Sequence, residues 1–349
     1  KTMKGYYVPR RFGWDCHGLP VEYEMMKTLG ISGTKQIKEY GVGKFNESCR
    51  SIVLRYTSEW EKIVKRLGRW VDFENDYKTM DPDYMESIWW VFKQLYDKGL
   101  VYEGYTIMPY SPALATPLSN FEVNLGGYQE VVDPAITVKF RLVDEQDTYF
   151  LAWTTTPWTL PSNTALTVGP KIDYVLVKSF NQYTHQPILV ILAKALVNKQ
   201  FSGKYFMAEP NELNYQEGDK KIPYTILGEC KGADLTNLSY EQLLPYAKPL
   251  ENPENAFRVI PGDFVTTEDG TGIVHTAPTF GADDAKVAKD ANVPALLVAD
   301  ENGNPTPLVD LRGRFTHHLK DDTYGLGGEY IKAEYLTDEE KATELSVQQ

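Results

Sequence analysis

The sequence predicts a mixed α/β protein in which a mainly helical region precedes a compact, β-rich domain. Apolar residues recur at three- and four-residue steps over 44–67, which is typical of an amphipathic helix. After Pro109 the chain becomes rich in proline and small residues, and short apolar or alternating stretches follow from residue 136 onward. With 349 residues, 42% of them hydrophobic and 24% charged, the chain is long enough for two or more domains, and wholesale disorder is excluded.

The helical region contains two clear helix signals. Over 44–67 the apolar positions fall on one helical face, and Gly68 supplies a residue that readily adopts the left-handed conformation of a helix end. A second helix is predicted from Asp81 as N-cap and Pro82 at the first helical position, and it ends at Gly99. Residues 31–100 are therefore expected to be mostly helical.

The β-rich region begins with a strand over 136–142, whose alternating apolar residues share one face. Further strands are expected at 148–155, 173–179, 187–192, 256–260, 271–276 and 295–299, with short helices at 193–201 and 283–291. Near the C-terminus, Thr337 and Glu340 have the spacing of a capping box and predict a polar helix. This mixture favours a barrel-like β domain with helices outside it.

Charge and cysteine content limit the class of protein. No apolar run approaches the roughly 20 residues that cross a bilayer, so we expect a soluble, cytoplasmic protein without a membrane partner. Three widely spaced cysteines, Cys16, Cys49 and Cys230, fit neither a disulfide framework nor a metal knuckle. The net charge is −12, yet residues 1–70 hold 14 Lys and Arg against 7 Asp and Glu. This basic end could contact a phosphate backbone or could simply be a solvated helix surface.

The segment WTTTPWTLPSN, residues 153–163, carries the strongest chemical signal in the chain. Three consecutive threonines at a strand end, followed by two stiffening prolines, place small polar groups along a narrow and rigid wall. Such a wall can hydrogen-bond an ester, a ribose hydroxyl or a water and leaves little room for an additional methyl group. The alternative is that β-branched threonines merely favour a strand.

A second polar segment, residues 262–284, contains His275 at the end of a short strand and the acidic pair Asp283 and Asp284. A carboxylate facing a pocket could bind an ammonium group, and the imidazole could shape the same pocket or hold a water. Asp283 is expected to act as the N-cap of the following helix, and Asp284 could be only a first-turn acid favoured by the helix dipole. A nucleophilic triad of Ser162, His275 and Asp284 is disfavoured because the sequence has no GxSxG motif.

Three stretches together resemble one family. GWDCHGLPVEYE at 13–24, WTTTPWTLPSN at 153–163 and GTGIVHTAP with the following acidic pair at 270–284 are similar to the isoleucyl-tRNA synthetases, which are class I aminoacyl-tRNA synthetases. Valyl and leucyl synthetases typically have TTRPxT where this chain has threonine, proline and tryptophan at 156–158. The HIGH and KMSKS signatures are absent, so the chain is expected not to make aminoacyl-adenylate.

The resemblance implies a domain organisation. Residues 1–30 correspond to a stub of a Rossmann-type nucleotide-binding catalytic fold, 31–132 to a mostly helical connective region, and 133–332 to an editing domain, also called CP1. Residues 333–349 correspond to a return segment and terminal helix. The zinc that many relatives hold near 109–112 is not expected, because this segment, PYSP, has no cysteine.

The resemblance also assigns roles within an editing site that hydrolyses mischarged valyl-tRNA(Ile). Thr154, Thr155 and Thr156 would line the wall near the scissile ester and the terminal adenosine. Asp284 would anchor the ammonium group of the substrate. The substrate-binding residues would be Trp153, Asn163, which supports the pocket, and His275, which helps to set the accepted side-chain size.

Outside the editing site, the resemblance makes Asp15 and His17 remnants of the synthetic amino-acid pocket. Editing needs no cofactor or metal, whereas the full-length enzyme would charge tRNA(Ile) with isoleucine using ATP and Mg²⁺. The partner is the acceptor end of tRNA(Ile), and a monomer is expected. The alternative function is a module that binds this acceptor end and hydrolyses little.

Overall fold

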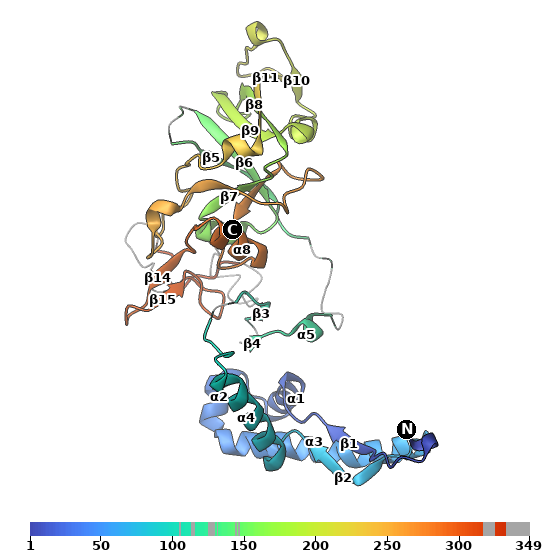
Figure 1. The fold of residues 1–349 in the computed structure, drawn as a ribbon. Coiled ribbons are helices and arrows are strands. Elements are labelled where there is room, and N and C mark those ends of the chain that lie inside the picture. Colours follow the sequence, from blue (N-terminus) through green and yellow to red (C-terminus); the bar gives the residue numbers. More distant parts are fainter. Residues whose placement is uncertain are drawn as a thin grey trace. The chain divides into compact units, whose positions relative to one another are not determined.

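The computed structural model describes residues 1–104, 106–112, 116–124, 130, 132–143, 145, 147–316 and 325–332. The chain divides into two compact units, the first within residues 1–116 and the second mainly from residue 117 onward (Figure 1). The return segment and terminal helix predicted at 333–349 lie outside the described residues. The mixed α/β class is confirmed, because helices dominate the first unit and sheets the second.

The first unit is built on two parallel strands, β1 (Arg11–Trp14) and β2 (Asp72–Lys78). Parallel strands need a crossover, and the chain between them supplies three helices, α1 (Leu19–Leu29), α2 (Gly33–Tyr40) and α3 (Val42–Arg66). A short 3₁₀ turn, η1 (Thr2–Lys4), precedes β1, and α4 (Pro82–Asp97) follows β2. Met25, Met26 and Phe45 form the small buried core where α1 packs on α3.

The two predicted helices of this unit are confirmed as α3 and α4, and both end as expected. Gly68 and Gly99 adopt φ of +75° and +68°, and their N–H groups donate to Lys65 O and Tyr96 O. Asp81 occupies the N-cap of α4 as predicted, with Pro82 at the start of the helix. Its side chain accepts a hydrogen bond from the N–H of Lys78 at 3.0 Å instead of bonding to the first turn of α4.

The second unit is organised around a six-stranded sheet in the order β10-β11-β8-β9-β6-β5. Its strands are β5 (Ile136–Arg141), β6 (Thr148–Thr154), β8 (Asp173–Phe180), β9 (Pro187–Ala193), β10 (Tyr205–Met207) and β11 (Ile222–Lys231). A three-stranded sheet has the order β12-β7-β13, with β7 (Ala165–Val168), β12 (Arg258–Pro261) and β13 (Ile273–Thr276). Two small pairs complete the strands, β3 (Tyr110–Ser111) with β4 (Thr116–Pro117) and β14 (Leu297–Ala299) with β15 (Pro305–Pro307).

Short helices fill the connections of this unit. They are α5 (Asn120–Asn124), α6 (Val197–Gln200), α7 (Gly232–Leu235) and α8 (Ala282–Asp290), with 3₁₀ turns η2 (Pro157–Ser162), η3 (Lys194–Leu196), η4 (Pro210–Glu212) and η5 (Pro253–Asn255). The predicted helices at 193–201 and 283–291 are thus confirmed, the first as a 3₁₀ turn running into α6.

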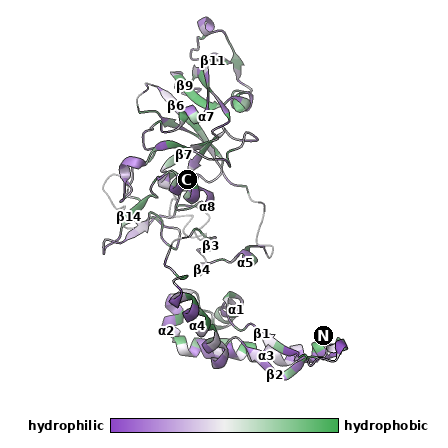
Figure 2. Cartoon of the chain, viewed as in Figure 1, coloured by the Kyte–Doolittle hydropathy of each residue, from purple (hydrophilic) through white to green (hydrophobic). Residues whose placement is uncertain are grey.

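The main core lies between the two sheets and joins them. Phe140, Phe150 and Tyr174 from the large sheet pack in one buried cluster with Leu166 and Ile273 from the small sheet. Figure 2 shows hydrophobic colouring on β6 and β9 of the large sheet. The predicted apolar face of β5 is confirmed at Phe140, which is fully buried, whereas Ile136 at the start of the strand is 38% exposed.

This core fixes three chain segments next to one another. Thr154 ends β6, η2 turns the chain, and Asn163 lies two residues before β7. Because β13 pairs antiparallel with β7, His275 lies opposite Leu166, and the N–H of Thr164 donates to Thr276 O. Within the part of the chain that is described, no helix has the length and apolarity needed to cross a membrane.

Candidate functional site

The residues from Thr154 to Thr159, here called the threonine turn, are held by their own side chains. The N–H of Thr156 donates to Thr154 Oγ1 at 3.0 Å, and the two hydroxyl oxygens lie 3.2 Å apart. Thr159 donates both its N–H and its hydroxyl to Thr156 O, at 3.0 and 2.9 Å. Thr154 is buried, while Thr155 and Thr156 are exposed. The turn therefore presents Thr155 and Thr156 at the surface, on a backbone that is held by hydrogen bonds of the buried Thr154 and Thr159.

His275 is buried, with 6% of its surface exposed, and both ring nitrogens have partners. Nε2 lies 2.8 Å from Thr159 Oγ1, and Nδ1 lies 2.8 Å from Asn163 Nδ2. The amide nitrogen can only donate, so Nδ1 must accept and the ring proton must be on Nε2. His275 is thus a neutral imidazole that donates to Thr159.

The electrostatic environment agrees with this assignment. Burial lowers the pKa of His275 to about 4, because the imidazolium would lose its hydration. Since both nitrogens are already bonded within the protein, the ring has no free nitrogen with which to activate a water. The ring nitrogens do not bond to Ser162 or Asp284, so the disfavoured nucleophilic triad is not formed. The role of the imidazole in shaping a pocket stays a prediction.

Asn163 links His275 to the core. Besides His275 Nδ1, its Nδ2 donates to Ala165 O at 2.8 Å, and its Oδ1 accepts a hydrogen bond of 2.6 Å from the Tyr240 hydroxyl. Sequence reasoning did not assign Thr159 or Tyr240 to the site. Thr159 could have been found from its place three residues after Thr156 within a 3₁₀ turn, but no local pattern marks Tyr240.

Asp284 lies in the first turn of α8, and its Oδ2 accepts a hydrogen bond of 2.8 Å from the N–H of Ala277. Burial raises the pKa of this carboxyl group, the bond from Ala277 lowers it, and the neighbouring charge of Asp283 raises it further. Asp284 therefore closes the loop that leads from the end of β13 into α8. The capping role expected of Asp283 is wrong, because Gly281 occupies the N-cap and Asp283 is exposed in the first turn.

Close contact between Gly281 and Asp284 provides a prediction. A Cβ at position 281 would lie 2.7 Å from Asp284 Cγ, so Gly281→Ala must displace the carboxylate from Ala277. We expect the free energy of unfolding to fall by about 1–3 kcal/mol, measured by urea denaturation. Gly228→Ala in β11 is the matched control, since its Cβ would meet no atom within 4 Å. Equal stability of the two variants would contradict this account.

Trp153 precedes the threonine turn on β6 and is half-buried. Its ring packs against Gly270, which has φ of +75° and where a Cβ would lie 2.8 Å from Trp153 Cε3. A glycine is therefore needed at this position for both the backbone conformation and the close approach. This contact joins the segment that carries His275 to the strand that carries the threonines.

Asp15 and His17 belong to the first unit, at the carboxyl end of β1, and both are exposed. Nδ1 of His17 lies 3.3 Å from Thr79 Oγ1, which in turn accepts a hydrogen bond from the N–H of Cys16. The carboxyl ends of parallel strands are where α/β folds usually bind ligands. The role of both residues in a synthetic pocket stays a prediction.

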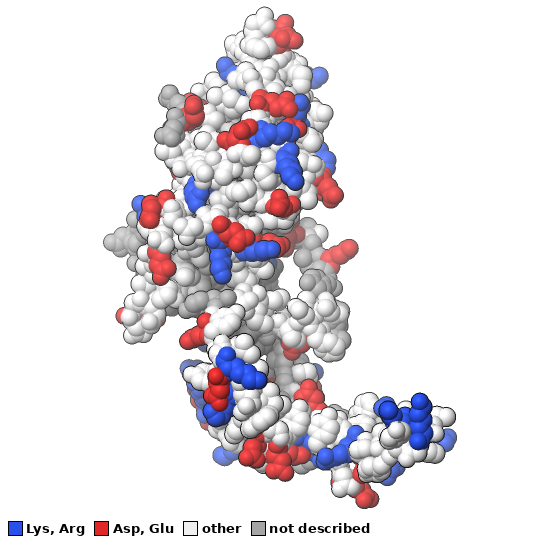
Figure 3. Space-filling model, viewed as in Figure 1, with Lys and Arg blue, Asp and Glu red and all other residues white. Residues whose placement is uncertain are grey.

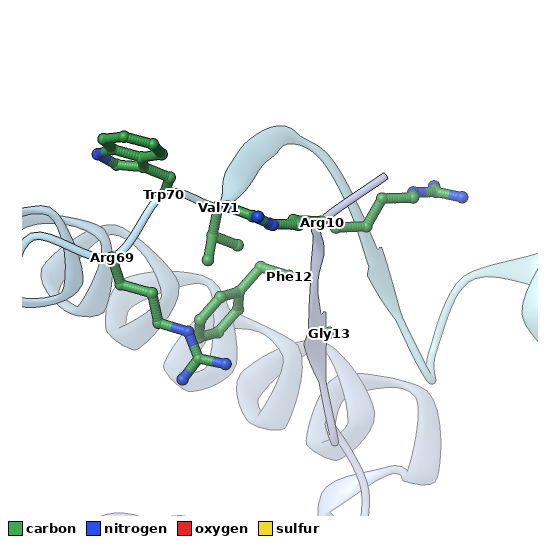
Figure 4. A pocket seen from close by; sticks show the side chains of 7 residues that line it. Arg10, Phe12, Gly13, Arg69, Trp70 and Val71 are labelled. Atoms are coloured by element: carbon green, nitrogen blue, oxygen red, sulfur yellow. The ribbon is translucent and has the colours of Figure 1, made fainter. Parts of the chain in front are cut away.

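A basic cavity of about 620 Å³ lies at the other end of β1 (Figure 4). Arg10, Arg11 and Arg69 line it together with Phe12 and with Trp70, a residue that is 81% exposed. Figure 3 shows Lys and Arg side chains gathered around this N-terminal end of the first unit. Guanidinium groups beside exposed aromatic rings can contact phosphates and stack on bases.

The second unit has a separate cavity of about 660 Å³ between β12 and α8, lined by residues that include Arg258, Asp263, Phe264 and Asp283. None of the predicted site residues lines it. Among the described residues, no group of three or more His, Cys, Asp or Glu side chains is arranged to hold a metal ion.

Comparison with known proteins decides the family. A family model described as tRNA synthetases class I (I, L, M and V) matches residues 1–300. The chain belongs to the class I tRNA synthetases. Relatives named isoleucine--tRNA ligase support the resemblance noted in the sequence. The relative from Cytophaga hutchinsonii is 52% identical over 99% of this chain and 31% of its own length, and that from Treponema denticola is 49% identical over 92% and 29%.

This synthetase chain thus spans about a third of the length of the curated relatives that it matches. Among solved structures, the editing domain of the P. knowlesi cytosolic leucyl-tRNA synthetase aligns with 48% of this chain and 65% of its own, with 15% identity and a TM-score of 0.34. The corresponding P. falciparum domain aligns with 42% of this chain and 47% of its own, with 17% identity and a TM-score of 0.31.

Proposed function

We propose that the second unit is an editing domain that hydrolyses valyl-tRNA(Ile), as the resemblance to isoleucyl-tRNA synthetases implies. A synthetic site must choose isoleucine over valine, which differ by one methylene. A single methylene supplies only about 1–3 kcal/mol of discrimination, a limit for which isoleucyl-tRNA synthetase is itself the standard example. Binding alone therefore admits too much valine, and a second pocket too small for isoleucine would remove the error.

One observation carries the proposal: the threonine turn and Asn163, from one segment, join His275, from a second segment more than 110 residues later, in one hydrogen-bonded network. A network whose members are mutually fixed makes a stiff boundary, and stiffness is what a size filter requires. The neutral ring of His275 can shape this boundary without attracting the charged end of a substrate. Thr155 and Thr156, exposed above it, would face the ester and the terminal adenosine.

The proposed reaction is direct attack by water on the ester carbonyl carbon. As the bond between that carbon and the ribose oxygen breaks, one proton of the water goes to the ribose oxygen and the other is released to solvent, so valine leaves as its carboxylate. Asp284 would hold the ammonium group of valine and so orient the carbonyl toward the water. An ammonium partner would offset the desolvation that raises the pKa of the Asp284 carboxyl group. The editing reaction so written uses no cofactor or metal.

The complete protein would charge tRNA(Ile) with isoleucine, using ATP and Mg²⁺ in a synthetic site to which Asp15 and His17 contribute. This part of the proposal rests on the family and on the position of both residues after β1.

Single-turnover hydrolysis of two substrates tests the editing proposal. The wild-type chain should cleave valyl-tRNA(Ile) and spare isoleucyl-tRNA(Ile). Thr155→Ala, which truncates an exposed side chain, and His275→Ala, which removes a buried ring, should both widen the pocket and allow isoleucyl-tRNA(Ile) to be cleaved. If a folded Thr155→Ala protein and a folded His275→Ala protein both still spare isoleucine, these residues do not set the size limit.

The alternative is a module that binds the acceptor end and hydrolyses little. The basic cavity around Arg10, Arg11 and Arg69 is the observation that favours it. In this case tRNA binding should weaken steeply with salt, since each neutralised phosphate releases counterions, while valyl-tRNA(Ile) remains uncleaved. Substantial turnover by the wild-type chain would instead support the editing enzyme.

A further inference from the structure

We propose that Tyr240 is a positioning residue of the editing site, which acts through Asn163 to hold His275 in the tautomer that donates to Thr159. The inference deepens the proposed function and rests on it for its effect on catalysis, but the tautomer itself can be measured without any substrate. The Tyr240 hydroxyl donates to Asn163 and not to the threonine turn or Asp284, so its influence passes through the Asn163 side chain.

Tyr240 is rigidly placed. Only 2% of its surface is exposed, and its ring packs edge-on against Phe140 and Phe257, with centroid distances of 5.3 and 6.2 Å. Its N–H donates to Phe257 O at 2.9 Å, which fixes the backbone as well. Burial raises the pKa of the phenol well above its usual value, so the hydroxyl keeps its proton and can donate at any ordinary pH.

The hydrogen-bond partners of the Asn163 side chain fix which way its amide group faces. Ala165 O can only accept, so the amide atom 2.8 Å from it must be Nδ2, and the atom 2.6 Å from the Tyr240 hydroxyl must be Oδ1. The second hydrogen of Nδ2 then points to His275 Nδ1. The Ala165 carbonyl excludes the flipped amide because it can only accept, and the Tyr240 hydroxyl supplies the donor for the other end of the same planar group.

From Tyr240 onward every hydrogen bond has the same direction. The phenol donates to Asn163, Asn163 donates to His275, His275 Nε2–H donates to Thr159, and Thr159 donates to Thr156 O. If the ring proton moved to Nδ1, it would face the Asn163 N–H group. Thr159 would also have to turn its hydroxyl toward Nε2 and abandon Thr156. The tautomer of His275 and the bonding of the threonine turn are therefore coupled.

Loss of the phenolic hydroxyl leaves Asn163 Oδ1 as a buried acceptor without a partner, which favours rotation of the amide. In Tyr240→Phe we therefore expect ¹⁵N NMR of the His275 ring to show a mixture of tautomers. In wild type the proton should be on Nε2 alone. Single-turnover cleavage of valyl-tRNA(Ile) should slow by about three- to tenfold through the rate constant, with little change in the tRNA concentration required for half-maximal rate.

Tyr174→Phe is the matched control. Tyr174 is also fully buried, and its hydroxyl donates to Gly272 O at 2.6 Å, but it does not bond to Asn163 or His275. This variant should lose comparable stability and keep the wild-type tautomer. Asn163→Asp provides a second test, because aspartate has nearly the same shape as asparagine. Its carboxylate accepts a hydrogen bond where the amide donated one. We expect it to draw a proton onto His275 Nδ1.

Three outcomes would overturn the proposal: a wild-type His275 protonated on Nδ1, a Tyr240→Phe protein with the wild-type ring spectrum, or a Tyr174→Phe protein with the same change of tautomer. If a variant fails to fold, the wild-type spectrum alone still tests the proposal, because it shows which ring nitrogen of His275 carries the proton. Failure of the proposed function is distinguishable, since a chain that cleaves no valyl-tRNA(Ile) can still show the predicted spectra.

Discussion

Asp284→Ala is expected to slow hydrolysis of valyl-tRNA(Ile) by at least tenfold in single-turnover deacylation. The proposed reaction needs the ammonium group of valine to be held while water reaches the ester, and Asp284 is the carboxylate assigned to it. A tenfold loss corresponds to about 1.4 kcal/mol of transition-state stabilisation, which is modest for a charge-assisted contact in a partly buried position.

Two further variants separate the charge from the structural contact of Asp284. Asp284→Asn keeps an oxygen that can accept from the N–H of Ala277 but has no charge, so it should fold normally and still be slow. Asp283→Ala removes the exposed acid of the same helical turn and should leave the rate within about twofold. Full activity of Asp284→Ala, or full activity of Asp284→Asn, would remove the carboxylate from ammonium binding.

Acidification is expected to destabilise the second unit through His275. The pKa of this residue is about 4 in the folded chain, against about 6.5 for an unperturbed histidine, so the unfolded state binds more protons between these values. The stabilisation is fully present above pH 6.5 and is lost as the pH falls toward 4. The pKa of His275 differs by roughly 2.5 units between the unfolded and the folded state, which corresponds to about 3 kcal/mol in the free energy of unfolding. Asp284 acts in the opposite direction, because its raised pKa favours the folded state at low pH.

Urea denaturation at pH 7 and at pH 4.5 measures this effect. The decrease in the free energy of unfolding from pH 7 to pH 4.5 should be clearly smaller in His275→Asn than in wild type, because asparagine does not titrate. His185→Asn is the control, because His185 is in a turn after β8, where φ of +58° suits asparagine. A wild-type pH dependence retained in His275→Asn would show that His275 is not its source.

Local patterns predicted much of the fold. The apolar spacing of 44–67 and the alternation around Phe140 are properties of single segments, and α3 and β5 follow them. The strand β11 was not predicted, since Pro223 and Gly228 interrupt its pattern, and its pairing with β8 shifts register between Ile226 and Gly228. The N-cap prediction is confirmed at Asp81 and wrong at Asp283, because an acid near a helix start can lie in the first turn as well as at the cap.

For the candidate site, too, the sequence predicted the residues but not their arrangement in space. Contiguous motifs identified the threonines, Asn163 and His275, whose roles in editing stay predictions. Their arrangement could not be predicted, because the bonds from Asn163 to His275 and to Tyr240 join residues 112 and 77 positions apart. Such contacts depend on how two sheets close around a shared core, which no single segment encodes.

The pairing of β13 with β7 constrains how this chain can change in length. His275 lies opposite Leu166, and its ring points inward because alternate residues of a strand face opposite sides. Inserting or deleting one residue within β13 would reverse this parity and turn the imidazole toward solvent. The three residues before β13 are also fixed, since Gly270 packs on Trp153, Thr271 O accepts from the N–H of Ala193, and Gly272 O accepts from Tyr174. Length changes are therefore penalised from Gly270 to Thr276.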